Sequence, residues 1–113
     1  MNIERGDVIN ARFPHASGTR GKKRPVVVLS RPDAIEVLHT VIVAPVTSTL
    51  RGAASEVAVG VAEGLKHESA VNTDHVQTVE QARLVRYVGR LGAAKMLAVC
   101  RALAIATGCD ADG

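Results

Sequence analysis

The stretch Gly21-Lys22-Lys23-Arg24-Pro25-Val26-Val27-Val28-Leu29-Ser30 places three cations directly before four apolar residues. A short apolar run of this kind predicts a strand over residues 25–30 that is buried on both faces. Because the start of a strand is rigid, Arg24 should be held in place, and a held arginine beside two lysines is a reasonable receptor for phosphate. For Lys22 and Lys23 alone, cations that merely keep a loop soluble are the favoured interpretation.

A second apolar run, residues 40–46, predicts the partner of this strand. The connection between the two runs is only about ten residues, which is too short for a helical crossover, so the strands should pair antiparallel. That pairing puts Pro25 near Val46. It puts Arg24 opposite Thr47, although a slip of one residue would change which side chains face each other.

The shared edge of this hairpin collects cations from one loop and hydroxyls from the other. These residues are Arg20, Lys22, Lys23, Arg24, Thr47, Ser48, Thr49 and Arg51. Cations, hydroxyls and loop amides are the groups that bind a phosphodiester. A solvated pair of loops with a threonine at a strand end is the alternative interpretation, and the pattern alone does not decide between the two.

Strands dominate the rest of the chain, and the period changes only near its end. Apolar and alternating patterns predict strands over residues 8–13, 56–59 and 84–91, and at least one strand over residues 69–79. Residues 93–107 predict a helix between Gly92 and Gly108. Its apolar stripe should consist of Met96, Leu97, Cys100, Leu103 and Ala104. We therefore expect a single domain over residues 1–113. It should be mainly β, with a strongly bent sheet or partly open barrel of antiparallel strands and a C-terminal helix.

The composition limits the class of partner. The length of 113 residues suffices for one core, and the hydrophobic fraction of 47% supports a folded globule. The net charge of +3 and the sequence pI of about 9.2 are compatible with an RNA or DNA partner. Because the chain has one Phe, one Tyr and no Trp, it cannot offer nucleic acid a platform of stacked aromatic rings.

No pattern in the sequence indicates a metal, a membrane or an oxidising compartment. No paired Cys or His residues have zinc-ligand spacing, and we expect no metal and no cofactor. There is no apolar run of membrane length, and Glu4 and Asp7 interrupt any signal-peptide pattern. Cys100 and Cys109 should be reduced thiols, because a helix holds residues at that spacing too far apart for a disulfide. We expect a cytoplasmic protein.

Several short motifs follow one another through nearly the whole chain. They are Arg5-Gly6-Asp7-Val8, Lys23-Arg24-Pro25-Val26-Val27-Val28-Leu29-Ser30, Val41-Ile42-Val43-Ala44-Pro45-Val46-Thr47-Ser48, Gly64-Leu65, Ser69-Ala70-Val71-Asn72-Thr73-Asp74-His75-Val76-Gln77-Thr78-Val79 and Gly89-Arg90-Leu91. Each motif alone is weak, but the ordered set is specific. In that set the chain resembles the MazF/PemK family of toxin endoribonucleases from toxin–antitoxin pairs.

The resemblance implies a fold, a reaction and partners. The fold is a compact SH3-like barrel with a C-terminal helix, working as a homodimer. The reaction is metal-independent cleavage of single-stranded RNA, an mRNA or another cellular RNA, at a short sequence. A cognate antitoxin would cover the RNA groove with an acidic segment. In such enzymes the arginine of the Arg-Pro motif and the threonine after the third strand are the catalytic pair, and these fall on Arg24 and Thr47.

Other residues are candidates for proton transfer and RNA binding. His15 lies in the first loop and is the natural proton carrier, because imidazole titrates near neutrality; an exposed histidine without a role is the alternative. Asn72, Asp74 and Gln77 carry groups that read base edges, although Asp74 is equally suited to capping a turn. Residues 16–23 contain no carboxylate, which leaves the general base open. RNA contacts are also expected from Arg20, Lys22, Lys23 and Ser48. Ordinary surface positions are the favoured interpretation for His67, His75, Arg83, Arg86 and Arg90.

Two other functions stay open at this point. The CcdB toxins share the fold and inhibit DNA gyrase by protein binding, without catalysis. The ending Ala-Thr-Gly-Cys, residues 106–109, lacks an aromatic side chain, which weighs against that mode. A degenerate protein that holds RNA without cutting it is the other alternative, and the presence of both Arg24 and Thr47 argues against it.

Overall fold

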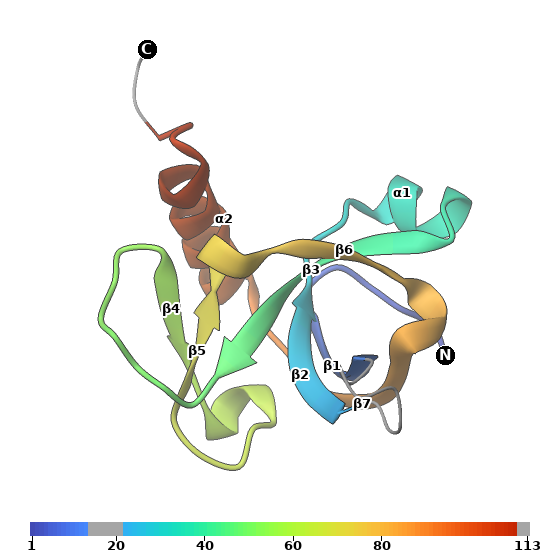
Figure 1. The fold of residues 1–113 in the computed structure, drawn as a ribbon, viewed down its shortest axis with the longest axis horizontal. Helices are drawn as coiled ribbons and strands as arrows, with labels where there is room; N and C mark the ends of the chain where they lie inside the picture. Colours follow the sequence, from blue (N-terminus) through green and yellow to red (C-terminus); the bar gives the residue numbers. More distant parts are fainter. Residues whose placement is uncertain (14–21, 111–113) are drawn as a thin grey trace.

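Short runs of β-branched residues build one antiparallel sheet of seven strands (Figure 1). The computed structural model describes residues 1–13 and 22–110. The strands are β1 (Asp7–Phe13), β2 (Lys22–Val28), β3 (Thr40–Thr47), β4 (Glu56–Val59), β5 (Ser69–Asn72), β6 (Gln77–Glu80) and β7 (Leu84–Arg90). The helices are α1 (Pro32–Val37) and α2 (Ala93–Thr107), with 3-10 turns η1 (Val61–Glu63), η2 (Thr73–His75) and η3 (Gln81–Arg83).

The sheet is open and branches at β3. Its strand order is β4-β5-β3-β2-β1-β7, and β6 pairs with β3 outside that path. The first half of β3 pairs with β6, whereas Val46 and Thr47 pair with β5. The sheet curls so that α2 packs beside β4 and β5 at one end, while α1 lies at the other (Figure 1). This arrangement confirms the expected partly open antiparallel barrel with a C-terminal helix.

The second half of β2, from Val26 to Val28, is buried on both faces, as its apolar run predicts. Val26 and Val28 pack in one core cluster, and Val27, between them, packs in the other; all three are fully buried. The first cluster consists of Ile9, Ala11, Val26, Val28, Val41, Val43, Val79 and Leu84. The second consists of Val8, Val27, Leu29, Ala44, Val46, Val57, Val59, Val71, Leu91, Val99 and Ala102. The helix α2 contributes Val99 and Ala102 and thus closes the second cluster.

Two expectations around β2 need correction. The strand begins at Lys22 rather than Pro25, because Lys22, Lys23 and Arg24 continue the pairing with β1 opposite Phe13, Arg12 and Ala11. The cations therefore belong to a strand rather than to the preceding loop. The connection to β3 contains a short helix, α1, which the pattern did not predict; Pro32 stands at its start, where a missing N–H costs nothing.

The C-terminal helix has the predicted bounds but a different buried face. Gly108 ends α2 with φ 74°, the left-handed conformation that glycine adopts most readily. Val99 and Ala102 are the buried residues, whereas Cys100 is exposed and Leu97 is 53% exposed. The predicted stripe is therefore wrong in these members. Apolar residues occur on nearly all sides of α2, so the hydrophobicity of its sequence does not distinguish the buried face from the exposed one.

Candidate functional site

The register between β2 and β3 brings Arg24 and Thr47 to the same edge of the sheet. Val28 pairs with Val43 and Val26 with Pro45. Continued by two residues, this register sets Arg24 opposite Thr47, as the sequence predicts. Both residues line one open cavity of about 600 Å³.

The ladder between the two strands stops just before these residues. Pro25 and Pro45 have no backbone N–H, and therefore neither can donate a hydrogen bond across the β2–β3 edge. Beyond Pro45, β3 pairs with β5 instead, and β2 before Val26 pairs only with β1. The strands thus part where the side chains of the site begin, which leaves room for a ligand between them.

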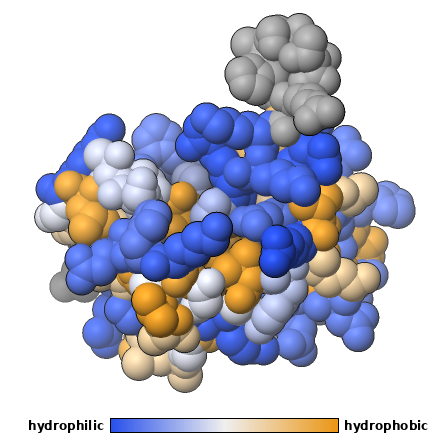
Figure 2. All heavy atoms as spheres, turned by 90° about the horizontal axis from the view of Figure 1, so that it is seen from below, coloured by the Kyte–Doolittle hydropathy of each residue, from blue (hydrophilic) through white to orange (hydrophobic). Residues whose placement is uncertain are grey.

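Five segments of the chain form the cavity. They are the centre of β1, the start of β2, the end of β3 with the loop after it, the segment 64–69, and the centre of β7. The described lining residues are Asn10, Arg24, Pro25, Val46, Thr47, Ser48, Thr49, Gly64, Leu65, Lys66, His67, Ser69, Arg86, Tyr87 and Val88. Seen from below Figure 1, the molecule presents a mostly hydrophilic face with smaller hydrophobic patches between (Figure 2). The cavity is therefore assembled from parts that lie far apart in the sequence.

The hydroxyl of Thr47 is fixed by the turn that follows β3. Its Oγ1 accepts a hydrogen bond of 3.1 Å from the backbone N–H of Thr49. A hydroxyl that accepts in this way still has its own proton to donate. Thr47 can therefore donate to an acceptor in the cavity, such as a phosphate oxygen, and exposed Ser48 offers a second hydroxyl beside it.

The charged lining of the cavity is cationic. Arg24, Lys66 and Arg86 line it, and no Asp or Glu is among its described lining residues. The ion pairs formed within residues 1–13 and 22–110 are Arg31–Asp33, Arg90–Glu4 and Arg90–Asp7. None of the three lining cations is used in them. An anion entering the cavity would therefore meet cations that no described carboxylate neutralises.

Two glycines hold the segment 64–69 against β7. Gly64 has φ +94°, and a Cβ placed on it would overlap the carbonyl oxygen of Val88. A Cβ on Gly89 would likewise overlap the carbonyl oxygen of Glu63. The two backbones can approach this closely only because both positions lack a side chain. The motifs Gly64-Leu65 and Gly89-Arg90-Leu91 thus serve to set one wall of the cavity.

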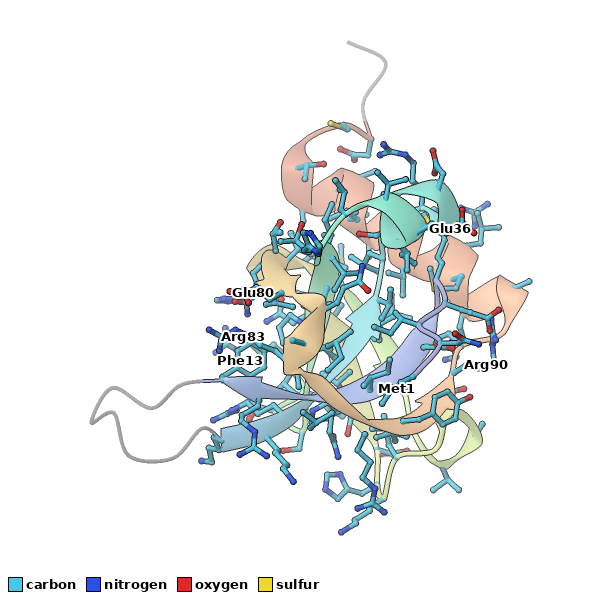
Figure 3. The ribbon with its side chains drawn as sticks, turned by 90° about the vertical axis from the view of Figure 1, so that its right-hand side faces the viewer. Met1, Phe13, Glu36, Glu80, Arg83 and Arg90 are labelled. Atoms are coloured by element: carbon cyan, nitrogen blue, oxygen red, sulfur yellow. The ribbon has the colours of Figure 1, made fainter. Side chains whose placement is uncertain are left out.

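Two bulges in β7 bring its side chains into the cavity. Ile9 pairs with Tyr87 and Val8 with Gly89, so Val88 is an extra residue; Val85 is skipped in the same way between Leu84 and Arg86. Bulges bend a strand and redirect its side chains. Arg86 and Tyr87 reach the lining as a result, whereas Arg83 lies beside the end of β1 and Arg90 at the far end of β7 (Figure 3).

The other predicted site residues that the structure describes are Asn72, Asp74, Gln77, Lys22 and Lys23, and none of them is among the described lining residues of the cavity. The Asn72 side chain accepts a 3.0 Å hydrogen bond from the backbone N–H of Asp74, whose Oδ2 accepts a 2.5 Å bond from the Ser55 hydroxyl. Asn72 therefore caps the turn η2, whereas the Asp74 side chain contacts Ser55, 19 residues earlier in the chain, and caps no turn in these contacts. Gln77 is exposed on β6. Lys22 and Lys23 are exposed on β2, next to Arg24. His15 and Arg20 lie outside the described residues, and a role in RNA binding stays a prediction for all of these side chains.

The cavity also contains residues that the sequence interpretation left out. The sequence pattern does not predict Asn10 or Lys66 in the site, and it favours ordinary surface positions for Arg86 and His67. The single tyrosine, Tyr87, is 51% exposed in the lining. The only signal for them was the pair of glycine motifs, which mark a close backbone approach but do not say what it carries.

The sequence of the chain matches a known protein family. The family described as "PemK-like, MazF-like toxin of type II toxin-antitoxin system" matches residues 4–107. The chain belongs to this family. Membership confirms the resemblance carried by the ordered motifs.

Relatives within the MazF group are similar over most of the chain. The probable endoribonuclease MazF5 of Mycobacterium tuberculosis is 48% identical over 89 residues, covering 78% of this chain and 82% of the relative. Endoribonuclease MazF3 of the same species is 40% identical over 82 residues, covering 73% of this chain and 80% of the relative.

Solved structures of MazF toxins share the fold. The Mycobacterium tuberculosis toxin MazF-mt6 superposes with a TM-score of 0.81 at 34% identity, covering 93% of this chain and 99% of the toxin. An endoribonuclease from a mycobacterial species, solved in complex with its cognate antitoxin, superposes with a TM-score of 0.82 at 25% identity, covering 95% and 96% of the two chains. Within residues 1–13 and 22–110 of this MazF-like toxin, no helix has the length and apolar character needed to cross a membrane.

Proposed function

We propose that this MazF-like toxin is an endoribonuclease that cuts single-stranded RNA, an mRNA or another cellular RNA, at a short sequence. The observation that carries the proposal is that Arg24 and Thr47 line one cavity whose described charged groups are cations. Cations and hydroxyls are the groups that hold a phosphodiester. The relatives in Mycobacterium tuberculosis that are named endoribonucleases support the same activity.

Cleavage uses the 2′-hydroxyl of the RNA as the nucleophile, which restricts the reaction to RNA. The 2′-oxygen attacks the adjacent phosphorus and the bond to the 5′-oxygen breaks, leaving a 2′,3′-cyclic phosphate and a 5′-hydroxyl. Arg24 clamps the phosphate and stabilises the charge that develops on its oxygens. Thr47, with Ser48 beside it, donates to a phosphate oxygen and fixes the orientation of the phosphate.

The reaction requires no metal ion in this proposal. Catalytic Mg²⁺ is normally held by carboxylates together with substrate phosphates. The described cavity lining offers cations, hydroxyls, an amide, an imidazole and a phenol in their place. In this arrangement Arg24, Lys66 and Arg86 supply the positive charge that a metal ion would otherwise bring.

Outside the cavity, the RNA follows a pair of cations on β1 and β2, Arg12 and Lys23, which we call the cationic ladder. Arg12 and Lys23 are directly opposite each other, and both are exposed. Like charges in such a pair destabilise a sheet, so the pair is costly unless a ligand neutralises it. Arg12 lies two residues from Asn10 on β1 and therefore on the face of the sheet that borders the cavity. A backbone phosphate bound between Arg12 and Lys23 would lie next to the cavity, on the face of β1 that also carries Asn10.

The proposed partners follow from the same charge pattern. A cognate antitoxin would cover the cavity with an acidic segment, because carboxylates compete with phosphates for the same cations. Structures of relatives in complex with an antitoxin, one mycobacterial and one MazE–MazF complex from Deinococcus radiodurans, support such a partner. We further propose a single toxin domain over residues 1–113, a homodimer, and action in the cytoplasm, where RNA and antitoxin are both present.

The activity is tested with a long single-stranded RNA incubated with the protein in EDTA, followed by analysis of the product ends. We expect cleavage with 2′,3′-cyclic phosphate and 5′-hydroxyl termini. Arg24→Ala should abolish cutting while the melting temperature stays near that of the wild type, because Arg24 is exposed at the strand start. Arg31→Ala is the matched control, since Arg31 is an exposed arginine outside the cavity.

Three results would each contradict part of the proposal. Absence of cleavage by the wild-type protein, combined with inhibition of DNA supercoiling by gyrase, would favour the CcdB-like mode. Full activity of Arg24→Ala would remove Arg24 from the mechanism. Cleavage that EDTA abolishes and Mg²⁺ restores would overturn the metal-free reaction while leaving the ribonuclease activity in place.

A further inference from the structure

One histidine lies in the cavity that contains Arg24 and Thr47. His67 belongs to the segment that follows Gly64, where the chain approaches β7, and it is one of the residues that line the cavity. The other described histidines lie elsewhere: His39 precedes β3, and His75 is in η2. His67 therefore shares the cavity in which Arg24 and Thr47 would bind a phosphodiester.

A hydrogen bond sets the tautomer of the His67 ring. Its Nδ1 lies 3.2 Å from the backbone carbonyl oxygen of Glu68. A carbonyl oxygen can only accept, so the proton of this bond is carried by Nδ1. The neutral ring then has its lone pair on Nε2, which is the arrangement of a general base. The Ser69 hydroxyl donates to the carbonyl oxygen of His67 at 3.2 Å and fixes the backbone that carries the ring.

The other described lining residues are poorly suited to accept a proton. Arg24, Lys66 and Arg86 are cations without a lone pair to offer near neutral pH. Hydroxyls such as that of Thr47 are weak bases. Tyr87 carries a phenol, whose oxygen is a much weaker base than an imidazole nitrogen. With no carboxylate in the described lining, the imidazole of His67 is the group of suitable basicity.

We propose that His67 is the general base of the cleavage reaction, which rests on the endoribonuclease activity proposed above. Nε2 takes the proton of the 2′-hydroxyl as the 2′-oxygen forms its bond to phosphorus. The bond between phosphorus and the 5′-oxygen breaks, and water protonates the departing oxygen. The hydroxide so formed is neutralised by the proton on the imidazolium, which restores His67. Atoms and charges balance with RNA as the only reactant consumed.

The first test compares rates for His67→Gln and the matched control His39→Gln. Glutamine retains a hydrogen-bonding group but cannot take up a proton at neutral pH. We expect His67→Gln to lower kcat by roughly 10²- to 10⁴-fold with little change in KM, and His39→Gln to behave as the wild type. Free imidazole added to His67→Ala should restore part of the lost rate. Equal kcat values in wild type and His67→Gln would overturn the assignment.

A pH–rate profile separates proton transfer from a merely structural role. The charged and titratable groups around the ring are Arg24 on β2, Arg86 and Tyr87 on β7, and Lys66 and Glu68 beside it in the chain. In the wild type, log kcat/KM should rise with pH with unit slope and level off once the imidazole has lost its proton. The rise should be missing in His67→Gln. A rise that persists there and vanishes in His15→Gln would assign the base to His15 instead.

A modified substrate distinguishes a base from an acid. Replacing the bridging 5′-oxygen by sulfur gives a leaving group that needs no proton. If His67 is the base, the defect of His67→Gln should persist with this substrate; a defect that disappears would make His67 the acid and overturn the proposal. Should the wild type cut RNA while His67→Gln cuts equally well, only the role of His67 falls. Should the wild type cut no RNA, the proposed activity and this role fall together.

Discussion

Replacing Gly89 by alanine should both destabilise the fold and slow catalysis. A Cβ at this position overlaps the carbonyl oxygen of Glu63 and also meets the Cα of Gly64 at 3.1 Å. Both obstacles are backbone atoms, which cannot turn aside as the end of a side chain can. The turn η1 and the strand β7 must therefore separate, by on the order of 1 Å, and backbone shifts of this kind cost about 1–3 kcal/mol.

The expected size of each effect follows from that separation. For a domain of this length each kcal/mol lowers Tm by roughly 4 °C, so Gly89→Ala should melt about 4–12 °C below the wild type. The same shift moves Lys66 and His67 relative to Arg24. Misplacement of catalytic groups by about 1 Å can cost roughly a hundredfold in rate, so cleavage should fall by tenfold or more at a temperature where both proteins are folded.

Gly60→Ala provides the matched control. Gly60 lies in the same turn, has extended backbone with φ −173°, and a Cβ on it would meet its nearest neighbour at an ordinary 3.8 Å. Thermal unfolding and RNA cleavage should therefore stay close to wild-type values in this variant. Equal Tm values for Gly89→Ala, Gly60→Ala and the wild type would refute the steric account of the contact between η1 and β7.

Three further perturbations test the cationic ladder, the core and the turn. Arg12→Gln and Lys23→Gln should each flatten the dependence of log Kd for RNA on log salt concentration by roughly 0.7, one phosphate contact, when binding is titrated at several ionic strengths; an unchanged slope would place the RNA elsewhere. Val27→Ala should lower the free energy of urea unfolding by about 2 kcal/mol, because Val27 is fully buried, whereas Val37→Ala, at 76% exposed, should change it by less than about 0.5 kcal/mol. Thr47→Val keeps the side-chain shape but removes the hydroxyl, which accepts from the Thr49 N–H and would donate to the phosphate. The variant should lose most cleavage activity and about 1 kcal/mol of stability. Retained activity would show that the Thr47 hydroxyl has no role in cleavage.

The position of Arg24 and Thr47, which follows from the pairing of two neighbouring strands, was predictable from the sequence. Two apolar runs joined by a short connection are expected to pair antiparallel, and the observed pairing of Val26 with Pro45 brings Arg24 and Thr47 to the same edge of the sheet. The predicted start of β2 was too late, because the pattern was read from its apolar residues. The strand extends to Lys22 because its backbone pairs with β1. This pairing uses backbone groups, so exposed cations can take part in it.

The other lining residues reach the cavity through contacts between distant parts of the chain, which no local sequence pattern specifies. Arg86 and Tyr87 enter the cavity through two bulges in the pairing of β1 with β7, strands that lie more than half the chain apart. His67 and Lys66 enter through the approach of Gly64 to Gly89. A glycine in a sequence indicates that a close approach is permitted but does not identify what approaches. The buried face of α2 was missed for a related reason, because alanine, valine and leucine occur on all its sides.

The residues of the site meet at one cavity because β2 and β3 separate there. Continued pairing beyond Val26 and Pro45 would close the gap between Arg24 and Thr47 with backbone hydrogen bonds. Pro25 and Pro45 cannot donate such bonds, and β3 turns to β5 at Val46. Arg24 and Thr47 therefore stay at the same edge of the sheet without the ladder that would exclude a ligand from between them. A rigid edge with an open centre is what binding a phosphodiester in one orientation requires.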